Sequence, residues 1–216
     1  MKFKEALGEL RKSSEKRKFD QTLDLVINLK SFDASRETIN TSVLLPYPAK
    51  NKKIAAFLDS IKKSDSLSLI ITKENLDKVT PKEIKKYAKE HDFFIASAKL
   101  MPQVAAKFGK VLGPAGKMPD PKIGSVLMEE SEPLLKEIVE KLKKTVKIKS
   151  KERSLKIPLA KESMSDEQIL ENIDKTFKTV TQALPKKEIN IRNVMLKFTM
   201  SKSIKVQYDK SKENKG

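Results

Sequence analysis

The sequence contains neither cysteine nor tryptophan and has a single histidine, His91. Without cysteine it can form no disulfide, no thiolate nucleophile and no metal site held by sulfur. Any catalytic triad or multi-histidine metal site would have to be built on His91. His91 follows an expected helix, where the helix dipole favours a cation, and we assign it no further role. We therefore expect a protein with no catalytic residue, no metal and no cofactor.

Long apolar runs are also missing from the sequence. No stretch of about 18 consecutive apolar residues is present, so we expect no membrane span and no membrane partner. Residues 1–12 read MKFKEALGELRK, which is charged and amphipathic and unlike the apolar centre of a signal peptide. These features favour a cytoplasmic protein.

The chain is strongly basic, with 46 Lys and Arg against 29 Asp and Glu and a formal charge of +17. The excess is spread along the whole chain, and such a field steers a protein toward a polyanion. Aromatic residues make up only 6% of the sequence, which argues against a platform that stacks single-stranded bases. A structured nucleic acid that presents its backbone is the better match. A lysine-rich surface is also compatible with an ordinary soluble protein, so charge alone locates no site.

Two kinds of strand are predicted. Residues 22–29, 189–192 and 204–207 alternate apolar and polar side chains, which indicates an antiparallel sheet with one face on a core. Residues 67–71 and 93–96 are almost continuously apolar, which is typical of strands covered by helices on both faces.

Helix signals lie between these strands. Thr80, Pro81 and Glu83 form the pattern of a capping box that opens a helix ending near His91. Ser165 opens another, with apolar residues at the helical period. Apolar spacing also predicts helices within residues 54–61 and 131–142.

The order of these elements predicts two domains. We expect a discontinuous α+β domain formed by residues 1–66 and 155–216, with an α/β domain of residues 67–154 inserted into it. The chain would cross between the domains near residues 63–65 and 151–153. Two crossings side by side form a hinge.

Four of the six glycines, Gly109, Gly113, Gly116 and Gly124, lie close together among several prolines. With Lys110 and Lys117 they predict a compact basic loop. The stretch matches neither the phosphate loop of nucleotide hydrolases nor the dinucleotide-binding pattern. Residues 113–116 match the short clamp of KH domains, which binds RNA. A plain connecting loop and an RNA-contacting loop both remain open.

A longer string within this loop resembles a known family. Residues 109–119, GKVLGPAGKMP, resemble the signature of the large-subunit ribosomal protein L-one family, whose members form the mobile stalk of the ribosome. Residues 18–22, 93–96 and 198–201 agree with the resemblance, which covers the whole chain and is closest to the archaeal and eukaryotic branch. It implies a discontinuous split β-α-β type domain that holds an inserted three-layer α/β (Rossmann-like) domain.

The resemblance places the main RNA site on the discontinuous domain, where two segments from opposite ends of the chain meet. The residues it implies, together with a neighbouring arginine, are Arg17, Lys18, Phe19, Thr22, Asp24, Thr199, Met200 and Ser201. The cations would contact phosphates, the hydroxyls and backbone groups ribose and base edges, and Phe19 and Met200 apolar surface. Without the resemblance, Phe19 could pack in a core and Asp24 could be a solvated strand residue. A secondary contact would use Lys110, Gly113, Gly116 and Lys117.

Two positions depart from the family pattern. Ser201 stands where the family usually has glycine, which would add a steric cost if that position needs a positive φ. Ala115 stands where the signature usually has a basic residue, which weakens a phosphate contact there.

The resemblance implies a structural constituent of the large ribosomal subunit, associated with the ribosome and monomeric away from it. It would bind the stalk region of the large rRNA, contact exit-site tRNA and help its release, and repress translation by binding its own mRNA. One alternative is a general RNA-binding chaperone without a unique rRNA site. Another is a nucleotide-dependent enzyme that uses Asp120 or the acidic run Glu129, Glu130 and Glu132.

Overall fold

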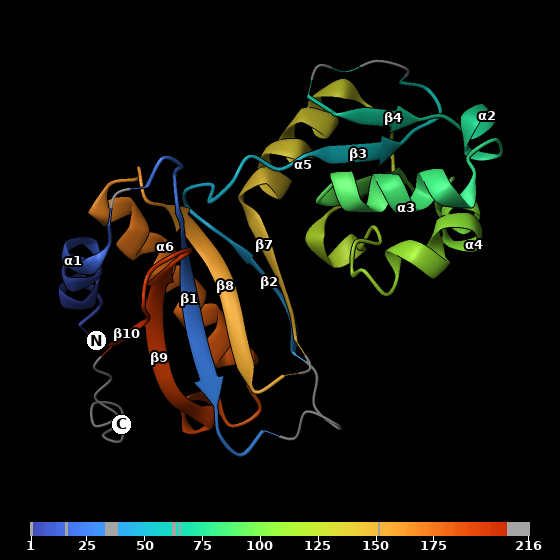
Figure 1. The fold of residues 1–216 in the computed structure, drawn as a ribbon. Coiled ribbons are helices and arrows are strands. Elements are labelled where there is room, and N and C mark those ends of the chain that lie inside the picture. The colour runs from blue at the N-terminus through green and yellow to red at the C-terminus, as the bar shows by residue number, and fades with distance from the viewer. Residues whose placement is uncertain are drawn as a thin grey trace. The chain divides into compact units, whose positions relative to one another are not determined.

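The computed structural model describes residues 2–15, 17–32, 39–61, 64, 66–150 and 152–206. The chain divides into two compact units (Figure 1). Unit 1 comprises Met1–Lys50 and Lys144–Gly216, and unit 2 comprises Asn51–Lys143.

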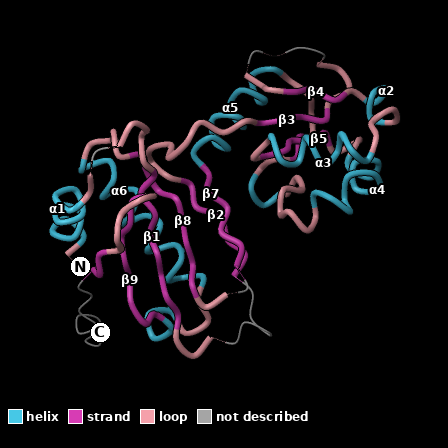
Figure 2. The backbone as a smooth tube through the Cα atoms, in the orientation of Figure 1, coloured by secondary structure: helices cyan, strands magenta, loops and turns pink. Residues whose placement is uncertain are grey.

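The main sheet of unit 1 is antiparallel and has the order β10 (Ile204–Val206), β9 (Ile191–Phe198), β1 (Thr22–Leu29) and β8 (Ser154–Lys161). Figure 2 shows β1 between β9 and β8. The alternation predicted for residues 22–29 is confirmed. The strand predicted at residues 189–192 is only partly right, because the short 3-10 helix η2 (Lys187–Asn190) precedes β9.

One face of this sheet packs on two helices, α1 (Phe3–Ser13) and α6 (Asp166–Ala183), the second of which lies behind the strands in Figure 1. Leu7 and Ile173 pack with Leu23, Leu25 and Ile27 in a single core. Alternate residues of the strands point to the opposite face. We call this the open face; it carries Thr22, Asp24, Val26 and Asn28 of β1, with partners on β8 and β9.

A second, two-stranded sheet also belongs to unit 1. It pairs β2 (Ile39–Leu44) with β7 (Thr145–Ser150) in antiparallel register. Directly beyond this pair, the Leu45 N–H donates to the Lys144 carbonyl at 3.0 Å. The chain therefore leaves and re-enters unit 1 at neighbouring points.

Unit 2 has a parallel sheet of order β4 (Leu69–Ile71), β3 (Ile54–Phe57), β5 (Phe93–Ser97) and β6 (Val126–Leu127). One core joins this sheet to α2 (Lys73–Leu76), α3 (Pro81–Glu90) and α4 (Met101–Leu112). A separate core joins it to α5 (Glu132–Lys144), and the short 3-10 helix η1 (Pro121–Ile123) precedes β6. The expected fold class, a three-layer α/β unit within a discontinuous α+β unit, is confirmed.

The helix predicted within residues 54–61 is wrong. Residues 54–57 form β3, and all four are buried between the layers of unit 2. A short, fully apolar run has no periodicity that separates a buried strand from a buried helix.

The unit boundaries also differ from those predicted. Because β3 pairs with β4 and β5, the first boundary lies at 50/51 and not at 66/67. Because β7 pairs with β2, the second lies at 143/144 and not at 154/155. The expected crossings near residues 63–65 and 151–153 move accordingly; residues 62, 63, 65 and 151 lie outside the described residues.

The predicted capping box at α3 is confirmed. The Thr80 hydroxyl accepts a hydrogen bond from the Glu83 N–H at 3.4 Å, and the Glu83 carboxylate accepts one from the Thr80 N–H at 2.8 Å. The bond from the Thr80 backbone, followed by that from its hydroxyl, lowers the pKa of the Glu83 carboxyl. At the start of α6 the Ser165 hydroxyl accepts a hydrogen bond from the Gln168 N–H at 3.4 Å.

Replacing Thr80 with alanine should destabilise unit 2 by about 1 kcal/mol, because a backbone N–H of the first turn loses its partner. Urea denaturation measures the loss. Thr72→Ala is a matched control, since Thr72 is the N-cap of α2 but its side chain makes no capping bond. Equal losses for the two variants would contradict the role given to the capping box.

Candidate nucleic-acid interface

The two predicted RNA-binding segments meet at the end of the central strand pair. Leu23 of β1 pairs with Phe198 of β9, which places Thr22 beside Thr199. The Thr199 hydroxyl accepts a hydrogen bond from the Thr22 N–H at 3.1 Å and donates one to the Thr22 carbonyl at 3.3 Å. The structure therefore joins two residues that are 177 positions apart in the chain.

Gln21 supports this junction through hydrogen bonds of its side chain. Its side chain is buried, and its carbonyl oxygen accepts from the Met200 N–H at 3.1 Å while its amide donates to the Ser14 hydroxyl at 3.3 Å. Satisfying both ends of a buried amide fixes its orientation. Gln21 is not among the residues predicted from the sequence. The sequence does carry a signal for it. Gln21 stands two residues before Leu23 and four before Leu25, so the alternation turns this polar side chain toward the core.

The turn after β9 is closed by Ser201. Its hydroxyl accepts from the Phe198 N–H at 2.9 Å and donates to the Lys202 carbonyl at 3.0 Å. Among the described residues, the non-glycine residues with positive φ are Ser31 and Lys187. Ser201 therefore bears none of the backbone strain that the glycine of the family pattern suggested, and its side chain adds a bond that glycine lacks.

Two large apolar side chains flank the junction and face solvent. Phe19 is 51% exposed and Met200 is 63% exposed, so Phe19 is not a core residue. Both side chains are therefore accessible to a ligand.

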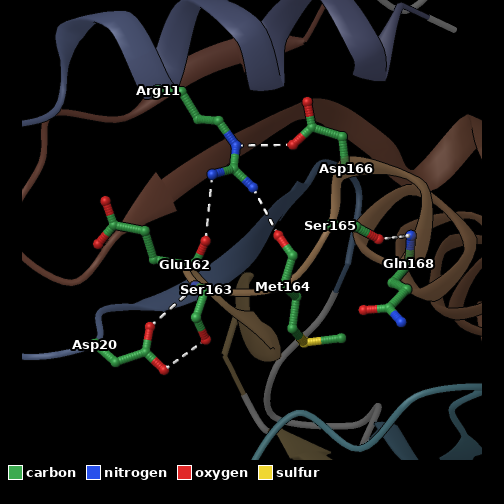
Figure 3. A network of polar contacts seen from close by, with 8 residues as sticks. All are labelled: Arg11, Asp20, Glu162, Ser163, Met164, Ser165, Asp166 and Gln168. Carbon is green, nitrogen blue, oxygen red and sulfur yellow. Dashed lines mark hydrogen bonds and ion pairs between the residues drawn. The ribbon is translucent and has the colours of Figure 1, made fainter.

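The segment that carries Phe19 is anchored by the network in Figure 3. The Asp20 carboxylate accepts from the Ser163 N–H at 3.1 Å and from its hydroxyl at 3.0 Å. Arg11 of α1 holds the same turn, since it donates to the Glu162 and Met164 carbonyls at 3.2 and 2.8 Å. Arg11 also pairs with Asp166 at 2.8 Å. The position of Phe19 thus depends on helix α1 and on the turn between β8 and α6.

Two cations at this edge, Lys18 and Arg17, are available to a ligand, whereas Lys161 is bonded within the junction. Lys18 is exposed and has no acidic partner in the described part of the chain. Arg17 is paired with Glu15 at 2.9 Å on the surface, an interaction weak enough to be exchanged for a phosphate. Lys161 donates to the Asp20 carbonyl at 3.0 Å and to the Thr22 hydroxyl at 3.2 Å.

Asp24 lies on the open face, opposite Lys197 of β9. Its partial burial raises the pKa of its carboxyl, and the charge of Lys197 offsets only part of this effect. A carboxylate kept partly dehydrated costs stability, and such groups are found preferentially at functional sites.

The glycine-rich loop lies in unit 2, at the end of α4. Gly113 is required there, because a Cβ would stand 2.7 Å from the Gly109 carbonyl oxygen, and Gly116 has a φ of 68°. The Lys117 ammonium donates to the Ala88 and His91 carbonyls, both at 2.7 Å, and so caps the end of α3. Of the two lysines predicted to bind RNA here, Lys110 is the exposed one and Lys117 serves the fold.

Two of the acidic residues considered for an enzyme, Glu130 and Asp120, serve the fold as well. The Glu130 carboxylate accepts from the Asp59 and Ser60 N–H groups at 3.1 and 2.6 Å, and Asp120 accepts from the Lys122 N–H at 2.9 Å. Burial raises the pKa of Glu130, but these backbone bonds, with one from Ser97, outweigh it and lower the pKa overall. Within the described ranges, no group of three His, Asp or Glu side chains could hold a metal ion, and no helix is long and apolar enough to cross a membrane.

The molecule is thus a strongly basic protein of two units, in which two distant segments form an exposed polar and apolar junction. Comparison with known proteins identifies the family. Residues 10–202 match the Ribosomal protein L1p/L10e family, and the chain belongs to it. It is a ribosomal protein, associated with the ribosome in the cytoplasm, and not an enzyme.

Archaeal relatives match over almost their full length, in agreement with the branch that the sequence resemblance implied. Large ribosomal subunit protein uL1 of Pyrococcus abyssi is 35% identical over 95% of both chains. The protein of the same name from Methanocaldococcus jannaschii is 34% identical over 97% of this chain and 96% of its own. That of Nanoarchaeum equitans is 33% identical over 93% and 99%, respectively.

Replacing Asp24 with asparagine should increase the free energy of unfolding at neutral pH while weakening RNA binding. The folded-state pKa is raised, so the ionised carboxylate destabilises the folded protein above that pKa. The stability difference between variant and wild type should therefore shrink as the pH falls through the folded-state pKa. Chemical denaturation between about pH 3 and pH 7 measures it. A wild-type protein that gains stability over Asp24→Asn with rising pH would contradict this account.

Proposed function

We propose that this protein is a constituent of the large ribosomal subunit and binds the stalk region of the large rRNA through the Thr22–Thr199 junction. The observation that carries the proposal is the reciprocal hydrogen bonding of these threonines between exposed Phe19 and Met200. Relatives named large ribosomal subunit protein uL1 support the assignment to the subunit. The net charge supplies attraction to RNA, and the junction supplies specificity.

Each side chain at the junction has a distinct role in this proposal. The Thr22 hydroxyl accepts from Lys161, so its own proton is free to donate to a ribose or base oxygen. The Thr199 hydroxyl donates its proton to the Thr22 carbonyl and accepts from the Thr22 N–H, so one lone pair remains to accept from an RNA donor. Asp24 accepts from ribose 2′-OH or base N–H groups. Arg17 and Lys18 contact phosphates, and Phe19, Met200 and the Ser201 turn pack against the sugar and base.

The proposal extends to contact with exit-site tRNA, repression of translation and a secondary RNA contact. Contact with exit-site tRNA and help in its release would use a hinge between the units, and the two chain crossings, at 50/51 and 143/144, support one. Repression of its own synthesis would follow if the message presents an RNA fold like that of the stalk. Exposed Lys110, beside the turn that contains Gly113 and Gly116, offers a secondary phosphate contact in unit 2. Away from the ribosome we expect a monomer.

The double variant Thr199→Val, Met200→Ala should bind a stalk RNA fragment about ten- to a hundredfold more weakly, which corresponds to about 1.4–2.8 kcal/mol. It loses the hydroxyl that fixes Thr22 and an exposed apolar contact. Binding to a random RNA duplex should not change, because attraction by charge is retained. Fluorescence anisotropy measures both affinities.

The matched control is Thr179→Val, Met128→Ala. The Thr179 hydroxyl bonds only within α6, and Met128 is 78% exposed in unit 2. This control should bind like the wild type. If the wild-type protein bound stalk RNA no better than random duplex, the protein would instead be a general RNA chaperone.

A variant in which a short glycine linker replaces residues 51–143 should fold and bind stalk RNA within about tenfold of the full chain. Unit 1 has its own core, and the neighbouring Leu45 and Lys144 allow the chain to be rejoined without distortion. Circular dichroism checks folding before affinity is measured. A folded unit 1 without preference for stalk RNA would show that the specific site lies elsewhere.

A further inference from the structure

A cavity of about 480 Å³ opens at the end of β1 farthest from Thr22, within unit 1. Three segments line it, residues 28–31, 153–154 and 192–193, and Leu29 is the one apolar residue among them. Of the described residues that line the cavity, three are cations and none is acidic. Part of the excess positive charge is thus gathered in a hollow that the Thr22–Thr199 junction does not use.

Backbone hydrogen bonds hold the three segments around this cavity in place. The Leu29 N–H donates to the Arg153 carbonyl at 2.7 Å, and the Lys30 N–H donates to the Asn190 carbonyl at 2.7 Å. The buried Asn190 amide also donates to the Lys30 and Ser31 carbonyls at 3.1 and 3.2 Å. The wall is therefore fixed before any ligand arrives.

Ser31 lies on this wall in a conformation that serine rarely adopts. Its φ is 52°, in the left-handed region, and the bond from Asn190 holds its carbonyl there. Non-glycine residues in this region cost free energy and are concentrated at binding sites. The strained backbone of Ser31 therefore supports a binding role for the cavity.

The donors around the cavity suit a phosphate. Arg153 donates through Nε to the Phe32 carbonyl at 3.2 Å, which orients its guanidinium and leaves both terminal nitrogens for a ligand. Among the described residues, Arg192 and Lys30 form no ion pair and are exposed. The side chains of Asn28 and Asn193 are joined at 2.7 Å, and each keeps further amide capacity. Two guanidinium groups beside an ammonium are the donor set that recognises phosphate oxygens bidentately.

We propose that this cavity binds phosphate groups of the same RNA as a second contact, an inference that rests on the proposed function. Thr22 and Asn28 both lie on the open face of β1, and six residues of strand separate them by about 20 Å. One folded RNA can bridge that span. The hollow measures about 480 Å³ and is open to solvent, so a phosphate group can reach its cations.

The test compares two double variants of the full chain that lose the same charge. Arg153→Gln, Arg192→Gln removes the guanidinium groups from the cavity. Lys175→Gln, Lys178→Gln removes two exposed cations from α6, which packs on the other face of the sheet. The cavity variant should bind stalk RNA about tenfold more weakly than the α6 variant. Its log–log salt slope should be smaller by about 0.7–0.9 for each phosphate that the cavity no longer binds.

The outcomes separate this inference from the proposed function. Equal losses and equal salt slopes in the two variants, with a wild type that prefers stalk RNA, would overturn the cavity site alone. A wild type with no preference for stalk RNA would overturn the proposed function instead.

A free phosphate compound could also supply the ligand, and NMR distinguishes the two sources. The side-chain amide signals of Asn28 and Asn193 should shift when stalk RNA is added to the wild type and stay in place in the cavity variant. Signals that move with inorganic pyrophosphate but not with stalk RNA would overturn RNA as the occupant.

Discussion

The pairing of β1 with β8 and β9 determines the organisation of unit 1. Both partners come from the opposite end of the chain, so this pairing joins the two chain segments of unit 1, which lie on either side of unit 2 in the sequence. It also places Leu23, Leu25 and Ile27 in the core, where each buried side chain contributes about 1.5–3 kcal/mol. A shift of register by one residue would turn these side chains to the open face and separate Thr22 from Thr199. The core and the RNA site therefore depend on one alignment.

Attraction and specificity are carried by different residues. The 46 basic residues outnumber the 29 acidic ones, and the resulting net positive charge attracts RNA regardless of its sequence. The junction that we propose to read the RNA is mostly uncharged, and its one acid, Asp24, sits where burial disfavours its ionised form. Several lysines are not available to RNA at all, because residues such as Lys107 and Lys117 bind helix-end carbonyls. The total number of cations is therefore larger than the number that can contact RNA.

Elements that are determined by residues close together in the sequence were predicted correctly. The alternation in residues 22–29 and the cap at Thr80 were sufficient, and the resemblance supplied the meeting of Thr22 with Thr199. Strand β3 and both unit boundaries were missed, because pairing across the sheets decides them and no periodicity records it. The supporting residues Gln21 and Asn190 were missed for a similar reason. Their role lies in hydrogen bonds to segments far away in the chain.

Amide hydrogen exchange of the full chain, with and without stalk RNA, tests the central claim most directly. The claim predicts that stalk RNA slows exchange in residues 17–22 and 199–201 together, since the two segments form one surface. A random duplex at equal occupancy should slow neither segment. Protection confined to unit 2, or the same protection with both RNAs, would contradict the claim that the Thr22–Thr199 junction selects the RNA.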